Sequence, residues 1–87
     1  MINIYKEIVR KYIKKVSIED VKMFAKENSI SYTTKEIEIV YQFIMNNYEE
    51  LLNHNEDCLM YLKENISPTL YEKLYVLYQK YYSLYLA

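Results

Sequence analysis

The residues with the widest chemical range in this 87-residue chain are its one histidine and its one cysteine. His54 and Cys58 are four positions apart, a spacing at which they could supply two of the four ligands of a zinc site. Asp57 and Glu50 lie nearby in the sequence. A structural zinc site needs four ligands, usually several cysteines or histidines, and this chain has one of each. We therefore expect no metal and no cofactor, with Cys58 as a small core residue and His54 on a surface loop.

Residues suited to catalysis are equally sparse. The chain has no glycine, which excludes the glycine-rich turns that bind phosphates and dinucleotides. One histidine and one cysteine leave a nucleophile without an orienting partner. The carboxylate pairs Glu49/Glu50 and Glu56/Asp57 are adjacent in sequence, so their side chains diverge on a helix. The sequence predicts that the protein is not an enzyme and has no small-molecule substrate.

The C-terminal segment carries two neighbouring apolar stripes at helical spacing. The first stripe consists of Leu70, Leu74, Leu77, Tyr81 and Leu84. The second, here called the tyrosine stripe, consists of Tyr71, Tyr75, Tyr78, Tyr82 and Tyr85. Together they cover about half of a helix, whereas a core-facing stripe needs only about 100°.

This excess of apolar surface predicts a partner. The leucines suffice to dock the helix on its own bundle, and tyrosine is enriched at interface hot spots. We expect the tyrosine stripe to bind a second copy of the chain, as a homodimer, or another protein. The alternative is that the rings pack at the margin of the core with their hydroxyls in water.

A basic segment at the other end of the chain offers a second function. Residues 1–16 contain five basic residues and one acid, whereas residues 17–65 contain four lysines and ten acids. Lys6, Arg10 and Lys14 form one exposed ridge of a helix whose two tyrosines are expected to point inward. Nucleic-acid binding through this ridge is the alternative that we consider, against a solvated face attracted to the acidic body.

Residues 18–47 also resemble a helix-turn-helix in spacing, but the details disagree. Lys35 occupies a position that should be buried early in the second helix. Glu36 and Glu38 lie on the flank that would face DNA, where they would repel phosphates. Two packed helices without DNA are the better interpretation.

Helix boundaries are well marked. Ser17 with Asp20, and Thr33 with Glu36, have capping-box spacing, and Ser67 precedes Pro68 as an N-cap precedes a first helical proline. Asn3 is a candidate cap for the first helix. In a chain without glycine, asparagine is the expected residue at helix ends, as at Asn28, Asn47, Asn53 and Asn65. We expect helices near residues 4–15, 18–28, 34–47, 55–65 and 68–85.

Apolar periodicity then predicts how these helices pack. The third helix is apolar on two sides, which is typical of a central helix. The first is expected to turn one face to the core, formed by Ile4, Tyr5, Ile8, Val9, Tyr12, Ile13 and Val16. The sequence predicts one all-α domain over residues 1–87, a small orthogonal bundle of about five helices around the third.

Composition favours a cytoplasmic protein without a membrane span. A single cysteine cannot form an intramolecular disulfide, which suits a reducing compartment. The longest apolar run, residues 58–62, is far shorter than the ~20 residues that a membrane span requires.

One stretch of the chain resembles a known family. It includes residues 17–21 and 24–26, then Ile30, Thr34, Ile37 and Val40, a polar break at residues 46–47 and the late Ser67–Pro68 pair. This pattern resembles the YqfT-like family of small proteins from low-GC Gram-positive bacteria, although the last helix is richer in tyrosine. The resemblance implies a bacterial cytoplasmic setting and carries over no activity and no site residues.

Overall fold

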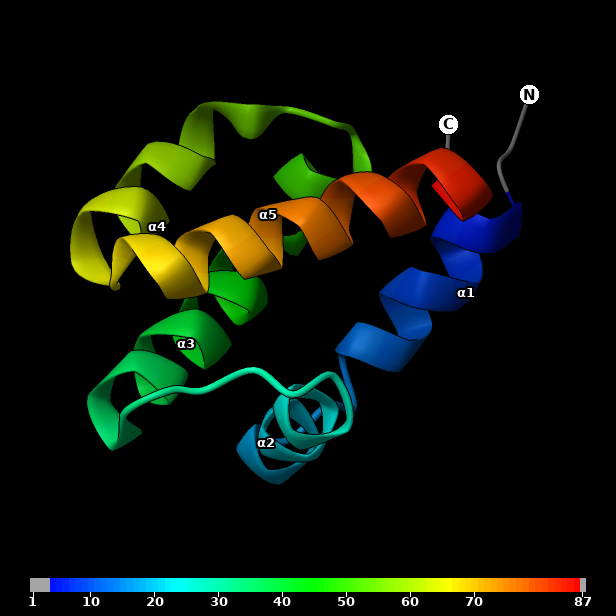
Figure 1. Ribbon diagram of the computed structural model, residues 1–87. Coiled ribbons are helices and arrows are strands. Elements are labelled where there is room, and N and C mark those ends of the chain that lie inside the picture. Colours follow the sequence, from blue (N-terminus) through cyan, green and yellow to red (C-terminus); the bar gives the residue numbers. More distant parts are fainter. Residues whose placement is uncertain (1–3, 87) are drawn as a thin grey trace.

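The computed structural model describes residues 4–86, and they form a bundle of helices with no strand among them (Figure 1). The helices are α1 (Ile4–Ile13), α2 (Ile18–Glu27), α3 (Thr34–Leu52), α4 (Leu59–Asn65) and α5 (Pro68–Tyr81). A 3-10 turn, η1 (Glu56–Cys58), precedes α4, and a π-helical turn, η2 (Tyr82–Leu86), follows α5. The predicted all-α bundle of about five helices is confirmed. None of these helices has the length and apolar content needed to cross a membrane.

Side-chain caps begin three of the helices as the sequence predicts. The Ser17 hydroxyl accepts a hydrogen bond from the Asp20 N–H (3.2 Å), and the Asp20 carboxylate accepts one from the Ser17 N–H (2.9 Å). The same reciprocal pair forms between Thr33 and Glu36. Ser67 accepts from the Leu70 N–H ahead of α5, whereas Asn3 lies outside the described residues.

Two helices end in a Schellman motif without glycine. Asn28 and Asn53 are the C-caps of α2 and α3, and the next residue takes the left-handed conformation: Ser29 has φ 56° and His54 has φ 57°. The Ile30 N–H then donates to the Ala25 carbonyl, and the Asn55 N–H to the Glu50 carbonyl, each at 2.8 Å. A left-handed residue with a Cβ costs roughly 1–2 kcal/mol relative to the right-handed form.

The predicted end of the third helix is wrong by five residues. Asn47 does not stop α3, because its side-chain amide donates to the Phe43 carbonyl within the same helix (3.0 Å). The apolar pattern then continues through Leu51 and Leu52, and Leu52 is buried. Burial of this last turn keeps α3 helical to residue 52.

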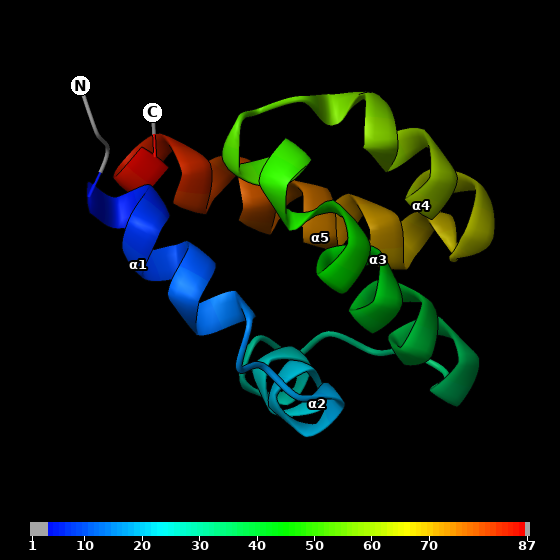
Figure 2. The ribbon, with the colours of Figure 1, turned by 180° about the vertical axis from the view of Figure 1, so that it is seen from behind.

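The core surrounds α3, as predicted. Its buried residues are Ile37, Val40, Phe43 and Leu52, and the helix contacts α1, α2, α4 and η1. Seen from behind, α3 crosses the middle of the molecule with α4 on one side and α1 on the other (Figure 2). Every buried hydrophobic residue in the described chain lies between residues 25 and 70: Ala25, Ile30, Ile37, Val40, Phe43, Leu52, Leu59, Leu62, Ile66 and Leu70.

Glu36 joins the starts of two helices that are distant in sequence. One carboxylate oxygen accepts from the Thr33 N–H in the capping box of α3, and the other accepts from the Ser67 N–H ahead of α5 (2.8 Å). These two backbone hydrogen bonds, first from Ser67 and then from Thr33, lower the pKa of the Glu36 carboxyl. The first turn of α5 is thereby held beside the first turn of α3.

Helix α1 does not bury the face that its periodicity predicts. No residue of α1 is buried, and the side chains of Ile4, Tyr5, Ile8 and Tyr12 are between 52% and 66% exposed. The helix contacts α3 and η2, so only one edge of its wide apolar arc is covered. The expectation that both tyrosines point inward is therefore wrong. Phe24 of α2 is also exposed.

Candidate interaction surface

Exposure of the two stripes changes along α5, and it does not separate the leucines from the tyrosines. In the first part of the helix Leu70 is buried, and Leu74, Tyr71, Tyr75 and Tyr78 are half-buried against the core. At the C-terminal end both stripes emerge. Tyr81, Leu84 and Tyr85, here called the α5 end, are between 40% and 61% exposed.

Two of the predicted interface tyrosines use their hydroxyls inside the chain. The Tyr75 hydroxyl donates to the Glu56 carboxylate at 2.7 Å, and the Tyr78 hydroxyl donates to the Leu51 carbonyl at 2.6 Å. The hydrogen bond to Glu56 raises the pKa of Tyr75. Burial raises the pKa of Tyr78 to about 12. These two hydrogen bonds connect α5 to η1 and to the end of α3.

The Glu56 carboxylate contacts polar side chains of α5 and of the turn after α3. Besides Tyr75, its carboxylate accepts from the Gln79 amide (3.2 Å) and lies 2.9 Å from the His54 Nε2. The hydrogen bonds from Tyr75 and Gln79 lower the pKa of this carboxyl. The ring of Tyr82 stacks on His54 with centroids 4.2 Å apart. His54 thus lies on a surface turn, as predicted, but it also packs against α5.

An apolar groove opens between the two ends of the chain. Its volume is about 670 Å³. Val9 and Ile13 of α1 form one wall, Leu74 and Tyr78 of α5 form the other, and Phe43 and Leu51 of α3 form the floor. In Figure 1, α5 lies above, α1 to the right and α2 below, while α3 passes behind. Among the described residues that line the groove, Asp20 is the only one that carries a charge.

The apolar lining continues over both lips of the groove. Ile4, Ile8 and Tyr12 follow one another at four-residue spacing along α1 and are exposed; they are called the α1 outer face below. The α5 end forms the opposite lip. Tyr5 and Tyr85 join the two lips at one end of the molecule, with ring centroids 6.0 Å apart. The groove and its lips therefore form one continuous apolar surface.

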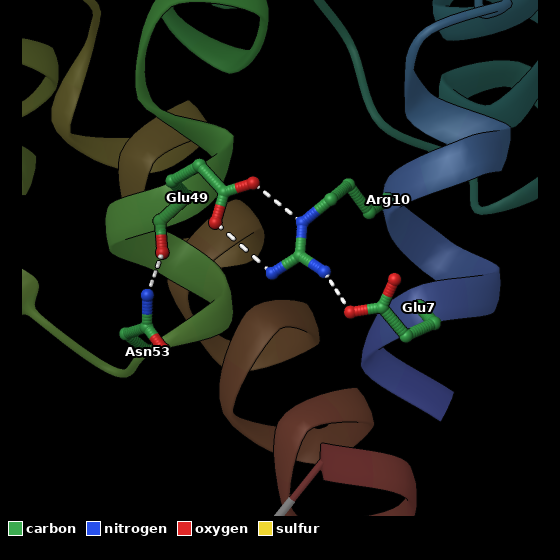
Figure 3. A network of polar contacts seen from close by, with 4 residues as sticks. All are labelled: Glu7, Arg10, Glu49 and Asn53. Carbon is green, nitrogen blue, oxygen red and sulfur yellow. Dashed lines mark hydrogen bonds and ion pairs between the residues drawn. The ribbon is translucent and has the colours of Figure 1, made fainter. Parts of the chain in front are cut away.

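One residue of the basic ridge predicted on α1 already forms ion pairs within the chain. Arg10 was expected to be exposed, but it is half-buried and engaged in ion pairs. Its guanidinium donates to both carboxylate oxygens of Glu49, at 2.5 and 3.1 Å, and also pairs with Glu7 (Figure 3). Its side chain is 24% exposed. Lys6 is half-buried, and Lys14 is exposed. The hydrogen bonds from Arg10 lower the pKa of Glu49, whose backbone carbonyl accepts from the Asn53 side chain in turn.

This ion pair explains how α1 is held. It connects α1 to α3 on the side away from the α1 outer face, and the Tyr41 hydroxyl of α3 donates to the Val16 carbonyl just after α1. Sequence reasoning missed the groove and the α1 outer face. The available signal was the breadth of the apolar arc on α1, which is the same feature that marked α5 as unusual.

Within residues 4–86 no three histidine, cysteine, aspartate or glutamate side chains gather closely enough to hold a metal ion. Cys58 is half-buried, and burial raises the pKa of its thiol. No family model, curated protein or solved structure matches this chain.

Proposed function

We propose that this protein is a small helical protein–protein interaction module that self-associates as a homodimer in the bacterial cytoplasm. The observation that carries the proposal is the apolar groove with its two exposed lips. Monomeric proteins seldom leave a continuous apolar surface beyond a few hundred Å² uncovered. A symmetric dimer is the commonest assembly that covers such a surface, because one patch can serve both copies.

The exposed area supports a second copy as the occupant. The chain exposes 6230 Å². A folded monomer of 10.7 kDa is expected to expose about 5,500 Å². The excess of about 700 Å² is close to the roughly 800 Å² that each partner buries in an interface of standard size.

The proposed surface keeps one end of the tyrosine stripe. Tyr85 lies on the lip and is available to a partner, whereas Tyr71, Tyr75 and Tyr78 are half-buried in the monomer and Tyr82 stacks on His54. The α1 outer face replaces them as the second half of the surface. Nucleic-acid binding is less well supported, since Arg10 of the ridge is already paired with two carboxylates.

Light scattering after size-exclusion chromatography tests the proposal. We expect the wild-type protein to have twice the 10.7 kDa chain mass. Ile8→Glu should produce a folded monomer with unchanged helical circular dichroism, because it places a charge in the contact of both copies. Met60→Glu is the matched control, because Met60 is 60% exposed on α4 and does not line the groove.

The control variant should remain a dimer. A wild-type protein that stays monomeric at millimolar concentration would refute self-association. A monomeric Met60→Glu beside a dimeric Ile8→Glu would move the interface away from the groove.

A further inference from the structure

We infer that the α1 outer face of each protomer packs on the α5 end of the second copy, so that two reciprocal contacts close both grooves. The inference rests on the proposed self-association and specifies which surfaces meet. It follows from three features of the two lips: their chemistry, their charge and their position.

The lips have complementary chemistry. The α1 outer face is mainly aliphatic, and the exposed Lys11 follows Ile4 two turns later on the same side of α1. The α5 end is aromatic, with the rings of Tyr81 and Tyr85 stacked at a centroid distance of 6.3 Å. Aromatic faces attract lysine ammonium groups, as the Lys80 Nζ already shows at 5.9 Å from the Tyr81 ring centroid. Exposed lysines beside aliphatic residues therefore suit this ring-rich surface.

Charge disfavours contact between two copies of α1. A parallel pairing of α1 with its own copy would bring two segments together that each carry five basic residues and one acid. Pairing of the two α5 ends would leave both α1 outer faces, which are exposed in the monomer, in water. The reciprocal arrangement instead places the basic α1 on α5, where residues 66–87 carry two lysines and one glutamate. It therefore brings fewer basic groups together than a contact between two α1 helices.

Position makes the reciprocal contact geometrically simple. The start of α1 lies beside η2, where Tyr5 meets Tyr85 (Figure 1). Because the two lips are neighbours in each protomer, one two-fold axis between them can set each lip of one copy against the other lip of its partner. The partner's aliphatic side chains would then cover the mouth of the groove, whose lining is almost entirely apolar.

Disulfide trapping between differently tagged chains tests the inference. Cys58, the only cysteine, is first replaced by alanine, and Ile8→Cys and Leu84→Cys are then made in separate chains. One chain carries a mass tag, so a crosslink between chains is distinguished from any product of one variant alone. After co-refolding and mild oxidation, we expect the mixed species to exceed either self-linked species at least about tenfold. Met60→Cys mixed with Leu84→Cys is the control and should give no mixed species above background.

The outcomes separate this inference from the proposed function. Predominant self-linking of Ile8→Cys or of Leu84→Cys would show that like surfaces meet, which overturns the inference while a dimeric mass upholds self-association. Absence of any crosslink in a protein that light scattering shows to be dimeric would also overturn it. A monomeric mass for both the wild type and the Cys58→Ala variant would refute the reciprocal contact and the proposed self-association together.

Discussion

The middle of the chain and its two ends both contain many apolar residues, but they differ in how these residues are covered. Between residues 25 and 70, ten hydrophobic side chains of α2, α3, α4, the start of α5 and the segments that join them are buried against one another. Helix α1 and the α5 end bury none, although their apolar patterns are as broad. An amphipathic pattern thus identifies apolar residues that favour burial. It does not show whether they are buried by the same chain or by a partner.

The largest difference between these regions should appear in stability. Phe43 is 3% exposed and Ile8 is 56% exposed. Phe43→Ala removes a buried ring and should lower the free energy of unfolding by about 3–5 kcal/mol. Ile8→Ala should change it by less than about 1 kcal/mol, because the side chain is already in water in the monomer. Urea denaturation at low protein concentration measures both, and equal losses would contradict the division into a packed middle and uncovered ends.

The two capping boxes provide a smaller test within the packed region. Asp20 caps α2 alone, whereas Glu36 caps α3 and also accepts from Ser67 ahead of α5. Asp20→Ala should cost about 0.5–1 kcal/mol, and Glu36→Ala about 1–2 kcal/mol, because the second change also releases the start of α5. Equal losses in chemical denaturation would mean that the Glu36–Ser67 hydrogen bond does not stabilise the fold.

Acid should weaken the same connections. Hydrogen bonds lower the pKa of Glu36 and of Glu56 below the ordinary value of 4.5. A carboxylate with a lowered pKa contributes stability that is fully present above pH 4.5 and is lost as the pH falls through its folded value. We therefore expect the melting temperature to fall below pH 4.5. The variant carrying Glu36→Gln and Glu56→Gln should show a shallower decline, and an unchanged slope would contradict this assignment.

The left-handed residues give the smallest expected changes. Ser29→Gly should raise the free energy of unfolding by about 1 kcal/mol, because glycine adopts φ near +56° without a Cβ clash. His54→Gly should gain less, or lose stability, because it also removes the stacking on Tyr82 and the contact with Glu56. Thermal melts of the two variants compare them directly, and an equal gain would show that His54 does not help to hold α5.

The sequence predicted the local features of the fold well. Ser17, Thr33 and Ser67 begin helices because a side chain bonds to backbone only a few residues away, and such bonds depend little on the rest of the chain. Asn47 misled the prediction because its side chain can bond back within α3 while burial of Leu52 extends the helix. Long-range packing decides that outcome.

The candidate surface was harder to predict for the same reason. Periodicity identified two stripes on α5, but both are buried or half-buried at the start of the helix and both become exposed at its end, at Tyr81, Leu84 and Tyr85. The hydroxyl partners of Tyr75 and Tyr78 lie 19 and 27 residues away in sequence, so their roles could not be inferred from spacing. The exposure of the α1 outer face likewise depends on where the Arg10–Glu49 pair holds that helix.

Hydrogen exchange measured at several protein concentrations tests most directly whether a second copy covers the two ends. In dilute protein, amides of α1 and of residues 79–86 should exchange faster than those of α3, because few buried contacts oppose local opening. Raising the concentration through the dimer dissociation constant should slow exchange in both end segments and leave α4 and its Met60 surface unchanged. Protection that does not change with concentration in either segment, in a protein that remains folded, would contradict the account.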